Sequence, residues 1–526
     1  MIRKIILYIH TIRHLKGEQI IGQIYHRFRS KFLNQKKLWD PGEAFNPEAI
    51  SLFAFQRDCV LNQDHNLFTF LNQTSSFQER INWNDLSHGK LWNYHLQYAY
   101  FLHDAKADLL KKKTWLLDIS QNIIDGIVKL EPFPVSIRLI QTLSFLNALK
   151  KMDETILRAV RMQSVWLKDN LEIHIGANHL LVNRISLALC SICCNWKDQE
   201  HFQIALSKEL NKQILSDGAH YERSPMYQLD ILELLLTLYS ACLAKQNRWS
   251  ETYKNYICKM AAWMQAMSNE GDVIPPFQDS TGDLRTKWIS IKEAIQSWNI
   301  PIQQIILNSS GYRKWTQDNE CFWINAGNIS PTHQPGHAHA DMMHFIWYSR
   351  NLPVIQDRSI STYEESPIRL KEKSTHAHNT VSVCGKEQSE MWSSFRVGRR
   401  AKLRILEEQE NYLKGWVTSP LFHTCNHERS FQMLPGKMMI LDHVSSCSED
   451  CLHKAYFHLD HRWSRNAIKI EQNSCSFASF RLEFEYANSV YTESYIQALD
   501  YNLSIESIRI VVQFRHQLNT TLRWND

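Results

Sequence analysis

The chain has 526 residues, which is enough for two large domains or three smaller ones with full hydrophobic cores. Its composition, 44% hydrophobic and 21% charged with 16 glycines and 14 prolines, excludes disordered and fibrous proteins. The net charge of +5 arises from 59 basic and 54 acidic residues and permits an anionic ligand. No block of Lys and Arg is present, so we expect no nucleic-acid partner.

The N-terminal segment predicts a surface helix rather than an export signal. Its apolar run extends only from Ile5 to Ile9 and is interrupted by His10, Arg13 and His14. A run of this length is too short for a transmembrane helix, and no small-residue cleavage site follows it. We expect an amphipathic helix that packs on the body of the protein or contacts a membrane surface peripherally.

The cysteine pattern bears on the cellular compartment. Of the 12 cysteines, Cys190, Cys193 and Cys194 fall in an apolar, helical stretch, and no repeated CxxC pair is present. We predict that most of the cysteines are reduced and buried, which favours the cytoplasm.

Between about residues 91 and 298 apolar residues recur at intervals of three and four, as in Ile137, Ile140 and Leu143. This spacing predicts amphipathic helices separated by turn and capping residues. The predicted helices are Trp92–His103, Lys113–Val128, Val135–Lys150, Ile156–Leu167, His179–Cys194, Phe202–Leu215, Pro225–Leu243 and Tyr253–Ser268. Helices of similar length with short connectors suggest hairpins wound into a ring, and the pattern fits an all-α solenoid equally well.

After about residue 300 the sequence changes to short β-rich runs separated by Gly, Asn, Asp and Ser, which predict an antiparallel β-sandwich. The runs are Cys321–Asn325, His344–Ser349, Thr380–Val383, Leu403–Leu406, Lys437–Leu441, Ala455–Leu459 and Ile508–Phe514. The fold class is therefore α+β and multidomain. We expect a helical domain at 1–300, with an N-terminal helical extension at 1–80, and a β-domain at 301–526. A cleft between them would be a favoured binding site.

One chemically distinctive segment of the helical half is DGAHYERSPMYQ, from Asp217 to Gln228. Ser224 is suited to cap a helix and Pro225 to occupy its first position. Tyr227 then falls in the first turn, where the positive end of the helix dipole favours a phenolate. The alternative is an ordinary capped helix whose tyrosine packs on its neighbours.

A second helix start lies in GANHLLVNR, from Gly176 to Arg184. The Asn178 amide and the His179 imidazole would suit a carboxylate from this position. In the alternative interpretation, Asn178 is only the helix cap.

The β half contains a histidine-rich segment, QPGHAHADMMHF. His337 and His339 would point to the same side of a strand, because alternate residues of a strand share a face. Together with two distant residues, Asp357 and His378, His339 forms an N/N/O set suited to Zn²⁺. A hydrogen-bonded polar network at the domain junction is the alternative.

An arginine-aromatic cluster follows in SEMWSSFRVGRRAK. Arg396 and Arg399 could grip a carboxylate or sulfate while Trp392 stacks on a sugar. They could equally hold the two domains together through ion pairs.

The segments NHLL, YERSPMY, GHAHAD, AHNTV and QSEMWSSFRVGRRA together resemble heparinase II/III-like polysaccharide lyases, in that order and with fitting spacing. WNYHLQYAYFL and EPFPVSIRL resemble members associated with bacterial surface-glycan and exopolysaccharide assembly. The resemblance implies an incomplete (α/α) toroid, a β-sandwich and a bacterial source. Because surface-glycan lyases of this kind often act in the periplasm, that compartment stands beside the cytoplasm as an expectation.

The resemblance also implies roles for particular residues. Asn178 or His179 would neutralise a uronate carboxylate, Tyr227 would be the tyrosine acid or base, and His337 its histidine partner. Tyr221 is the rival for the tyrosine role.

Further roles follow by position. Arg138 and Arg223, which lie within the matching segments, are added as substrate-binding candidates. His339, Asp357 and His378 match the positions of a structural zinc site. The sequence departs from the usual Asp-Ser-Gly after Asp357, where it reads Asp-Arg-Ser.

The implied reaction is β-elimination on an acidic, uronate-containing polysaccharide, which leaves a 4,5-unsaturated uronate. Two alternatives come from other classes. A glycoside hydrolase on the same toroid would need two opposed carboxylates, for which Glu131, Glu222 and Asp341 are candidates. A non-catalytic glycan-binding or assembly factor would keep the cleft without the reaction.

Overall fold

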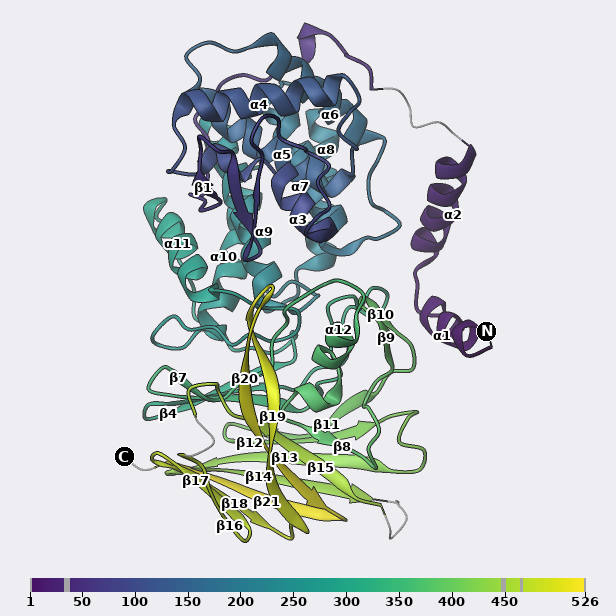
Figure 1. Ribbon diagram of the computed structural model, residues 1–526, viewed down its shortest axis with the longest axis vertical. Helices are drawn as coiled ribbons and strands as arrows, with labels where there is room; N and C mark the ends of the chain where they lie inside the picture. Colours follow the sequence, from purple (N-terminus) through teal and green to yellow (C-terminus); the bar gives the residue numbers. More distant parts are fainter. Residues whose placement is uncertain (1, 33–37, 446–450, 464–466, 525–526) are drawn as a thin grey trace.

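The computed structural model describes residues 2–32, 38–445, 451–463 and 467–524. A helical domain and a β-domain are stacked along the long axis of the molecule (Figure 1). The last helix of the first domain, α11 (Leu284–Ser297), is followed by the first strand of the second, β4 (Tyr312–Gln317). The chain therefore leaves the helical domain for the β-domain between α11 and β4.

The helical domain is an incomplete toroid of two layers. The inner helices α5 (Pro132–Phe145), α7 (Ala177–Cys193) and α9 (Pro225–Ala244) pack side by side, and their side chains are buried around most of the helix surface. Helices with apolar residues on all sides are the ones that pack in a core. The remaining helices are α3 (Gly89–Gln97), α4 (Leu109–Ile124), α6 (Glu154–Lys168), α8 (Gln199–Gln213) and α10 (Ser250–Met267).

Each predicted helix overlaps an observed one, with a difference at Trp92–His103. There α3 ends at Gln97 and a separate 3₁₀ turn follows at Tyr100–His103, because Ala99 adopts a left-handed conformation with φ of 62°. Among the described helices only α9 is long and apolar enough to cross a membrane, and 78% of that window is buried inside the protein.

The N-terminal helices α1 (Ile2–Ile12) and α2 (Gly17–Phe32) lie along the side of the molecule (Figure 1). The Tyr8 ring of α1 is 5.1 Å from the ring of Trp392 in the β-domain. Gln19 of α2 donates a 3.4 Å hydrogen bond to the Ile175 carbonyl of the toroid. These helices therefore pack on both domains, and contact with a membrane stays a prediction.

The predicted helical extension at 1–80 is wrong in its second half. Residues 60–76 form a three-stranded antiparallel sheet of β1 (Val60–Asn62), β2 (Leu67–Phe70) and β3 (Gln73–Ser76). Leu71 and Asn72 both have positive φ, 54° and 58°, and join Phe70 to its partner Gln73 in a two-residue hairpin turn. The short alternation of buried Phe68 and Phe70 drives this pairing.

The β-domain contains three larger antiparallel sheets. One orders β4, β5 (Glu320–Asn325), β6 (His344–Ser349) and β7 (Leu352–Ile355). A second orders β19 (Ser489–Asp500), β20 (Leu503–Phe514), β15 (His453–His458) and β8 (Val381–Ser382). The eight-stranded third sheet orders β11 (Lys402–Gln409), β12 (Tyr412–Thr418), β13 (Asn426–Leu434), β14 (Lys437–Ser445), β21 (Gln517–Trp524), β18 (Phe480–Glu485), β17 (Ser474–Phe477) and β16 (Lys469–Glu471). Each predicted strand coincides with or overlaps one of these.

The long β19–β20 hairpin reaches from the sandwich to the toroid (Figure 1). At its tip, the Asn502 amide donates to the Leu71 carbonyl at 2.9 Å. In return, the Asn72 amide donates to the Tyr501 carbonyl at 2.9 Å. Two hairpin tips, β2–β3 and β19–β20, therefore clasp each other across the domain junction.

A buried arginine joins the domains on another side. Arg223, which precedes α9, donates to the Asn328 carbonyl at 2.5 Å and to the Asn325 side chain, and its guanidinium lies 4.8 Å over the Tyr312 ring. These hydrogen bonds join the toroid to the β-domain. The structure therefore gives Arg223 a role in domain contact in place of the expected role in substrate binding. Gly327 leaves room for this guanidinium.

We expect Gly327→Ala to lower the free energy of unfolding by about 2 kcal/mol, because an added Cβ would lie 2.5 Å from Arg223 Cζ and displace a buried, hydrogen-bonded charge. Gly17→Ala is the matched control, since nothing lies within 4 Å of its added Cβ. Urea unfolding would measure both changes. Equal stability of the two variants would contradict the assigned role of Arg223.

Candidate active site

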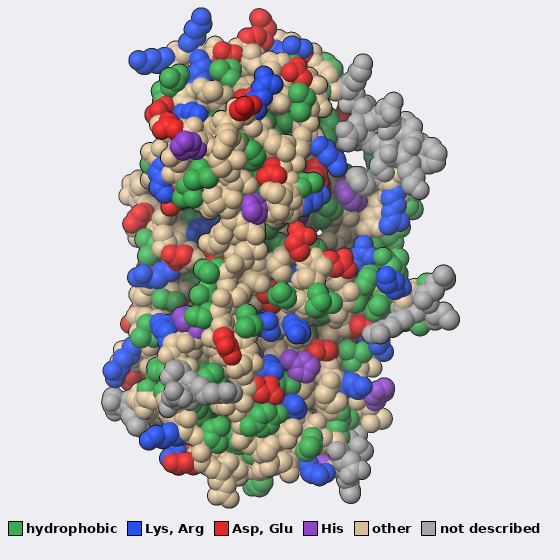
Figure 2. Space-filling model, viewed as in Figure 1, with side chains coloured by type: hydrophobic (Ala, Val, Ile, Leu, Met, Phe, Trp, Pro, Cys, Tyr) green, Lys and Arg blue, Asp and Glu red, His purple; other side chains and the backbone are tan. Residues whose placement is uncertain are grey.

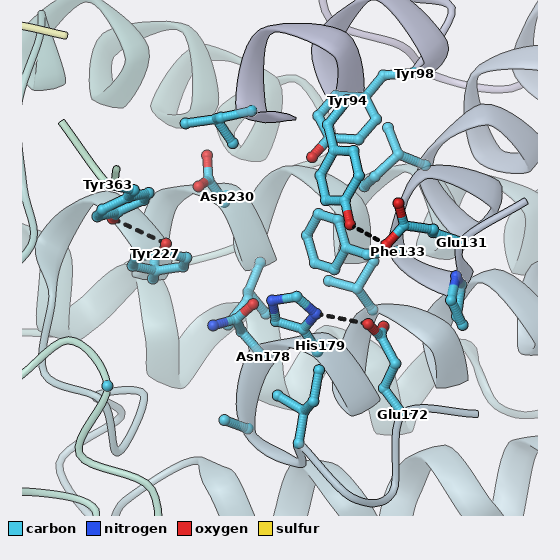
Figure 3. Close-up of a pocket in the computed structure, with 18 of the residues that line it drawn as sticks. Tyr94, Tyr98, Glu131, Phe133, Glu172, Asn178, His179, Tyr227, Asp230 and Tyr363 are labelled. Atoms are coloured by element: carbon cyan, nitrogen blue, oxygen red, sulfur yellow. Dashed lines mark hydrogen bonds and ion pairs between the residues drawn. The ribbon is translucent and has the colours of Figure 1, made fainter. Parts of the chain in front are cut away.

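A cavity of about 1630 Å³ lies between the toroid and the sandwich. The inner helices α5, α7 and α9 supply one wall, and loops of the β-domain supply the other. Asn178, His179, Tyr227 and His337 all line it, although they come from segments up to 159 residues apart. Figure 3 shows Asn178 lying between Tyr227 and His179.

Tyr227 is positioned by the predicted helix start. Pro225 occupies the first turn of α9, and the Ser224 side chain accepts a hydrogen bond from the Tyr227 N–H. The Tyr227 ring centroid is 4.2 Å from that of His337, and its hydroxyl lies 2.9 Å from the Tyr363 hydroxyl (Figure 3).

The expected phenolate at Tyr227 is not what the surroundings favour. Burial raises the pKa of Tyr227 well above its ordinary value, and the nearby Tyr501 and Asp279 act in the same direction. Removal from water therefore outweighs the helix dipole, and the free protein keeps the Tyr227 proton. The group is consequently available as a proton donor.

Asn178 and His179 lie in the first turn of α7, whose N-cap is Gly176 with φ of 72°. Asn178 is therefore not the cap, and its amide faces the cavity. Asn178 Nδ2 lies 2.8 Å from Glu222 Oε2 and 3.4 Å from His337 Nε2.

The His179 imidazole is held by a buried carboxylate. Its Nδ1 lies 2.9 Å from Glu172 Oε1, and its ring is 4.6 Å from the Phe133 ring (Figure 3). Burial acts to lower the pKa of His179, but the Glu172 carboxylate outweighs it and raises this pKa above its ordinary value. His179 therefore brings positive character to the wall beside Asn178.

A carboxylate that sequence analysis missed organises the histidines. Asp279 accepts from His337 Nδ1 at 2.7 Å, from His339 Nε2 at 2.8 Å and from both terminal nitrogens of Arg369 at 2.6 Å. Its side chain has no exposed surface. Because a carboxylate only accepts, the proton of neutral His337 is on Nδ1 and the Nε2 lone pair faces the cavity.

His337 and His339 do not lie in a strand as predicted. They belong to the loop between β5 and β6, and both rings reach Asp279 because the loop wraps around that carboxylate. Asp279 is 58 residues from His337, and Arg369 is 90 residues from Asp279. No local sequence pattern marks either residue.

The structure changes one residue of the predicted metal site, because His344 takes the place of His339. Asp357 Oδ2 lies 2.7 Å from His344 Nε2 and 2.8 Å from His378 Nδ1, and these three residues form a buried group that could hold a metal ion. His339 lies beside this group, with its ring 5.1 Å from that of His378, but its Nε2 is taken by Asp279.

The chemistry of this group fits zinc. Two imidazoles and one carboxylate are ordinary zinc ligands, and the buried His339 Nδ1 and His378 Nε2 make no hydrogen bond to any described residue. A bound ion would tie β6 to the loops that follow β7. His344 was overlooked, although it belongs to the same QPGHAHADMMHF segment as His337 and His339.

Two other predicted residues lie off the cavity wall. The Tyr221 ring packs against His220 and His333, with centroids 4.9 and 5.7 Å away. Buried Arg138 donates to the Gln97 carbonyl and the Gln163 side chain at 2.8 and 2.7 Å. Neither lines the cavity, whereas Tyr227 does.

The arginine-aromatic cluster likewise forms a packing contact. The Arg396 guanidinium lies 5.1 Å from the Tyr8 ring centroid and 5.2 Å from that of Trp392. Arg399 pairs with Glu390 through two hydrogen bonds of 3.0 and 2.8 Å. The structure assigns these side chains to the contact with α1 and to the surrounding loop rather than to the cavity.

Two family models cover most of the chain: the heparinase II/III N-terminus matches residues 133–299, and the heparinase II/III-like C-terminal region matches residues 304–525. The chain belongs to the heparinase II/III-like family. No curated protein matches the sequence.

Three solved structures share the fold of this chain. A crystal structure of heparinase III has a TM-score of 0.67 and 15% identity, over 98% of this chain and 92% of that one. The structure of heparan sulfate lyase HepC from Pedobacter heparinus has a TM-score of 0.56 and 14% identity, over 96% of this chain and 88% of that one. The structure of a chondroitin AC lyase mutant from Streptomyces coelicolor A3 has a TM-score of 0.50 and 8% identity, over 82% of this chain and 74% of that one. This family member therefore has their toroid-plus-sandwich architecture.

Asp279 generates a prediction on pH and stability. Burial alone would raise the pKa of Asp279, but Arg369 and the two histidines hold it well below its ordinary value of about 3.9. A carboxyl whose folded pKa is lowered stabilises the protein above its unfolded pKa, and this contribution disappears as the pH falls through the folded value. We expect stability to decline below about pH 4.

In Asp279→Asn the decline should be shallower, and at pH 7 the protein should be less stable by about 3–5 kcal/mol, because Arg369 is left buried without its partner. Urea unfolding across the pH range measures both effects. Identical pH profiles for the variant and the parent protein would contradict this role.

Proposed function

We propose that this protein is a polysaccharide lyase that cleaves a uronate-containing polysaccharide by β-elimination and leaves a 4,5-unsaturated uronate. The observation that carries the proposal is the orientation of His337: Asp279 holds its Nδ1, so that Nε2 faces the same cavity as the Tyr227 hydroxyl. A base and an acid from different domains thus meet beside the Asn178 amide.

The reaction requires three functions from the protein. The C5 proton of a uronate is weakly acidic because the adjacent carboxylate is charged, so that charge must be offset as the enediolate develops. A base must take the C5 proton. An acid must give a proton to the O4 oxygen as the C4–O4 bond breaks, and each transfer typically contributes roughly 10²–10⁴-fold.

Asn178 and His179 would offset the uronate charge. The amide offers N–H donors, and the Glu172-bound imidazole supplies positive character. Asn178 Nδ2 also lies 3.4 Å from His337 Nε2 in the free protein. A substrate carboxylate that draws this amide to itself would leave the His337 lone pair free at the moment when it is needed.

His337 and Tyr227 would then divide the two proton transfers. His337 Nε2 takes the C5 proton and becomes an imidazolium whose other N–H remains bonded to Asp279. The electron pair of the C5–H bond forms the C4–C5 double bond, and the C4–O4 bond breaks. Tyr227, whose pKa is raised, gives its proton to the departing oxygen. Proton exchange with solvent restores both residues.

A hydrolase is less well supported. Asp341 does not line the cavity and accepts hydrogen bonds from Gln278 and Asn325 at 2.7 and 2.8 Å. Glu131 is held by the Tyr94 hydroxyl at 2.6 Å and by Lys90 at 2.7 Å. Of the three candidates, Glu222 is the one that lies beside His337. Neither Glu131 nor Asp341 provides the second, opposed carboxylate that a hydrolase needs.

The charge of the cavity wall bears on the substrate. Among the described residues that line it, ten are Asp or Glu and five are Lys or Arg. Arg57 pairs with Glu233, Lys90 with Glu131, and Lys287 with Asp230 and Glu233, so at least three of these cations are already neutralised. The face shown in Figure 2 also mixes both signs without a basic patch. We infer that the polymer is acidic through its uronates and carries few sulfates.

Tyr227→Phe should fold normally, bind the polymer and lower kcat by about 10²-fold or more, because the O–H that protonates the leaving oxygen is lost. Tyr221→Phe is the matched control and should remain near the parent rate, since Tyr221 lies off the cavity. Ultraviolet absorbance of the unsaturated product measures turnover and excludes hydrolysis. Near-normal elimination by Tyr227→Phe would overturn the assignment.

The test uses uronate polymers that differ only in sulfation. The unsulfated polymer should have a kcat/KM about tenfold or more above that of the sulfated one, because added sulfates face an acidic wall. Raising the ionic strength should narrow this preference, since salt screens the repulsion. The same absorbance assay applies. A preference for the most sulfated polymer would show that the inferred substrate class is wrong.

A further inference from the structure

A cysteine-histidine cluster lies in the β-domain, outside the residues that line the cavity. Cys384 and Cys451 form a disulfide, and Cys425 is also disulfide-bonded. The Cys425 Sγ lies 4.0 Å from the Cys384 Sγ. His453 Nδ1 lies 4.0 Å from Cys384 Sγ and 3.9 Å from Cys451 Sγ. The ligand atoms of Cys384, Cys451 and His453 thus lie within 4.8 Å of one another, and the Cys425 sulfur lies beside Cys384.

The Nδ1 atom of the imidazole is a hydrogen-bond acceptor beside the sulfurs. The Cys384 backbone N–H donates to His453 Nδ1 at 3.2 Å, so that nitrogen carries no proton. His453 has no exposed surface, and Cys425 is 7% exposed. A neutral imidazole is the form that binds a metal, and a zinc ion would take over the Nδ1 lone pair from the Cys384 N–H.

We propose that the reduced form of this cluster binds one zinc ion through Cys384, Cys425, Cys451 and His453. Three thiolates and one imidazole are a common structural zinc set. With Zn–S bonds of about 2.3 Å, a tetrahedral site places its sulfurs about 3.8 Å apart, close to the observed separation of Cys384 and Cys425. Disulfides alone give no reason for His453 to converge on the same sulfurs.

The exchange between the two states is a reduction followed by metal binding. A dithiol reductant supplies two electrons and two protons to the Cys384–Cys451 bond and is itself oxidised to a disulfide. Other disulfide bonds at the cluster are reduced in the same way. Zinc then replaces the protons of the coordinating thiols, and these protons pass to solvent. A reducing compartment thus favours the zinc form, and an oxidising compartment the disulfide form.

The position of the cluster defines what the ion would do. Cys384 follows β8, and His453 is the first residue of β15, which pairs with β8 in the four-stranded sheet. Cys425 directly precedes β13 in the eight-stranded sheet. One ion would therefore fasten the two sheets of the sandwich to each other. This role is separate from the Asp357 group and from the proposed reaction.

Cobalt substitution tests the site. The full chain, reduced with a dithiol and stripped of metal, should bind Co²⁺ with the charge-transfer absorption of thiolate ligands, and Zn²⁺ should abolish that absorption. Cys384→Ser and His453→Asn should each lose most of it. Cys475→Ser, at a free buried cysteine of β17, is the matched control and should keep it. Asp357→Asn should also keep it, because the second metal group contains no sulfur.

Stability supplies an independent measurement. A chelator should lower the melting temperature of the reduced parent protein by more than that of reduced Cys384→Ser, because an ion in the Asp357 group would be removed from both proteins equally. Three results would each overturn the proposal: no thiolate absorption in the reduced parent protein, absorption that persists in both cluster variants, or a Cys384–Cys451 disulfide that survives dithiol treatment in the folded protein.

Discussion

The buried Asp279 carboxylate is the interaction on which the cavity depends. It lies in the loop between α10 and α11, yet its partners are two histidines of the β-domain and Arg369 of α12 (Pro367–Glu372). A carboxylate without exposed surface is stable only if its charge is balanced and its lone pairs are occupied. The same four groups therefore join the domains and set the direction of the His337 lone pair, so that folding and chemistry share one charge network.

Local patterns predicted the elements well, because helices and strands follow from spacing within a few residues. Ser224 and Pro225 marked the start of α9, and the β-rich runs marked strands of the sandwich. The hairpin at residues 67–76 was missed because its alternation covers only four residues and its turn lacks glycine. The left-handed Ala99, which divides a predicted helix, likewise has no signal in its side chain.

The site was predictable where it rests on short segments and on the family resemblance, which placed Asn178, His179, Tyr227 and His337 in one cavity. Contacts between residues that are distant in the sequence were not predictable. Nothing near Asp279 announces its pairing, and the ionisation of Tyr227 was misjudged because burial is a property of the folded protein. The contacts of the arginines were not predictable for a related reason: a guanidinium that fits a sulfate fits a tyrosine ring or a glutamate equally well.

The clasp between the β2–β3 and β19–β20 hairpins has a consequence for biosynthesis. Its partners Asn72 and Asp500 are 428 residues apart, and Asp500 and Tyr501 also line the cavity. A ribosome that adds about 5–20 residues per second takes on the order of a minute between these two hairpins. The toroid can fold during that interval, but its open face stays without this wall until β19 and β20 have been made. Completion of the cavity therefore waits for a hairpin that is made long after α2, whose Glu18 and Ile21 already belong to the lining.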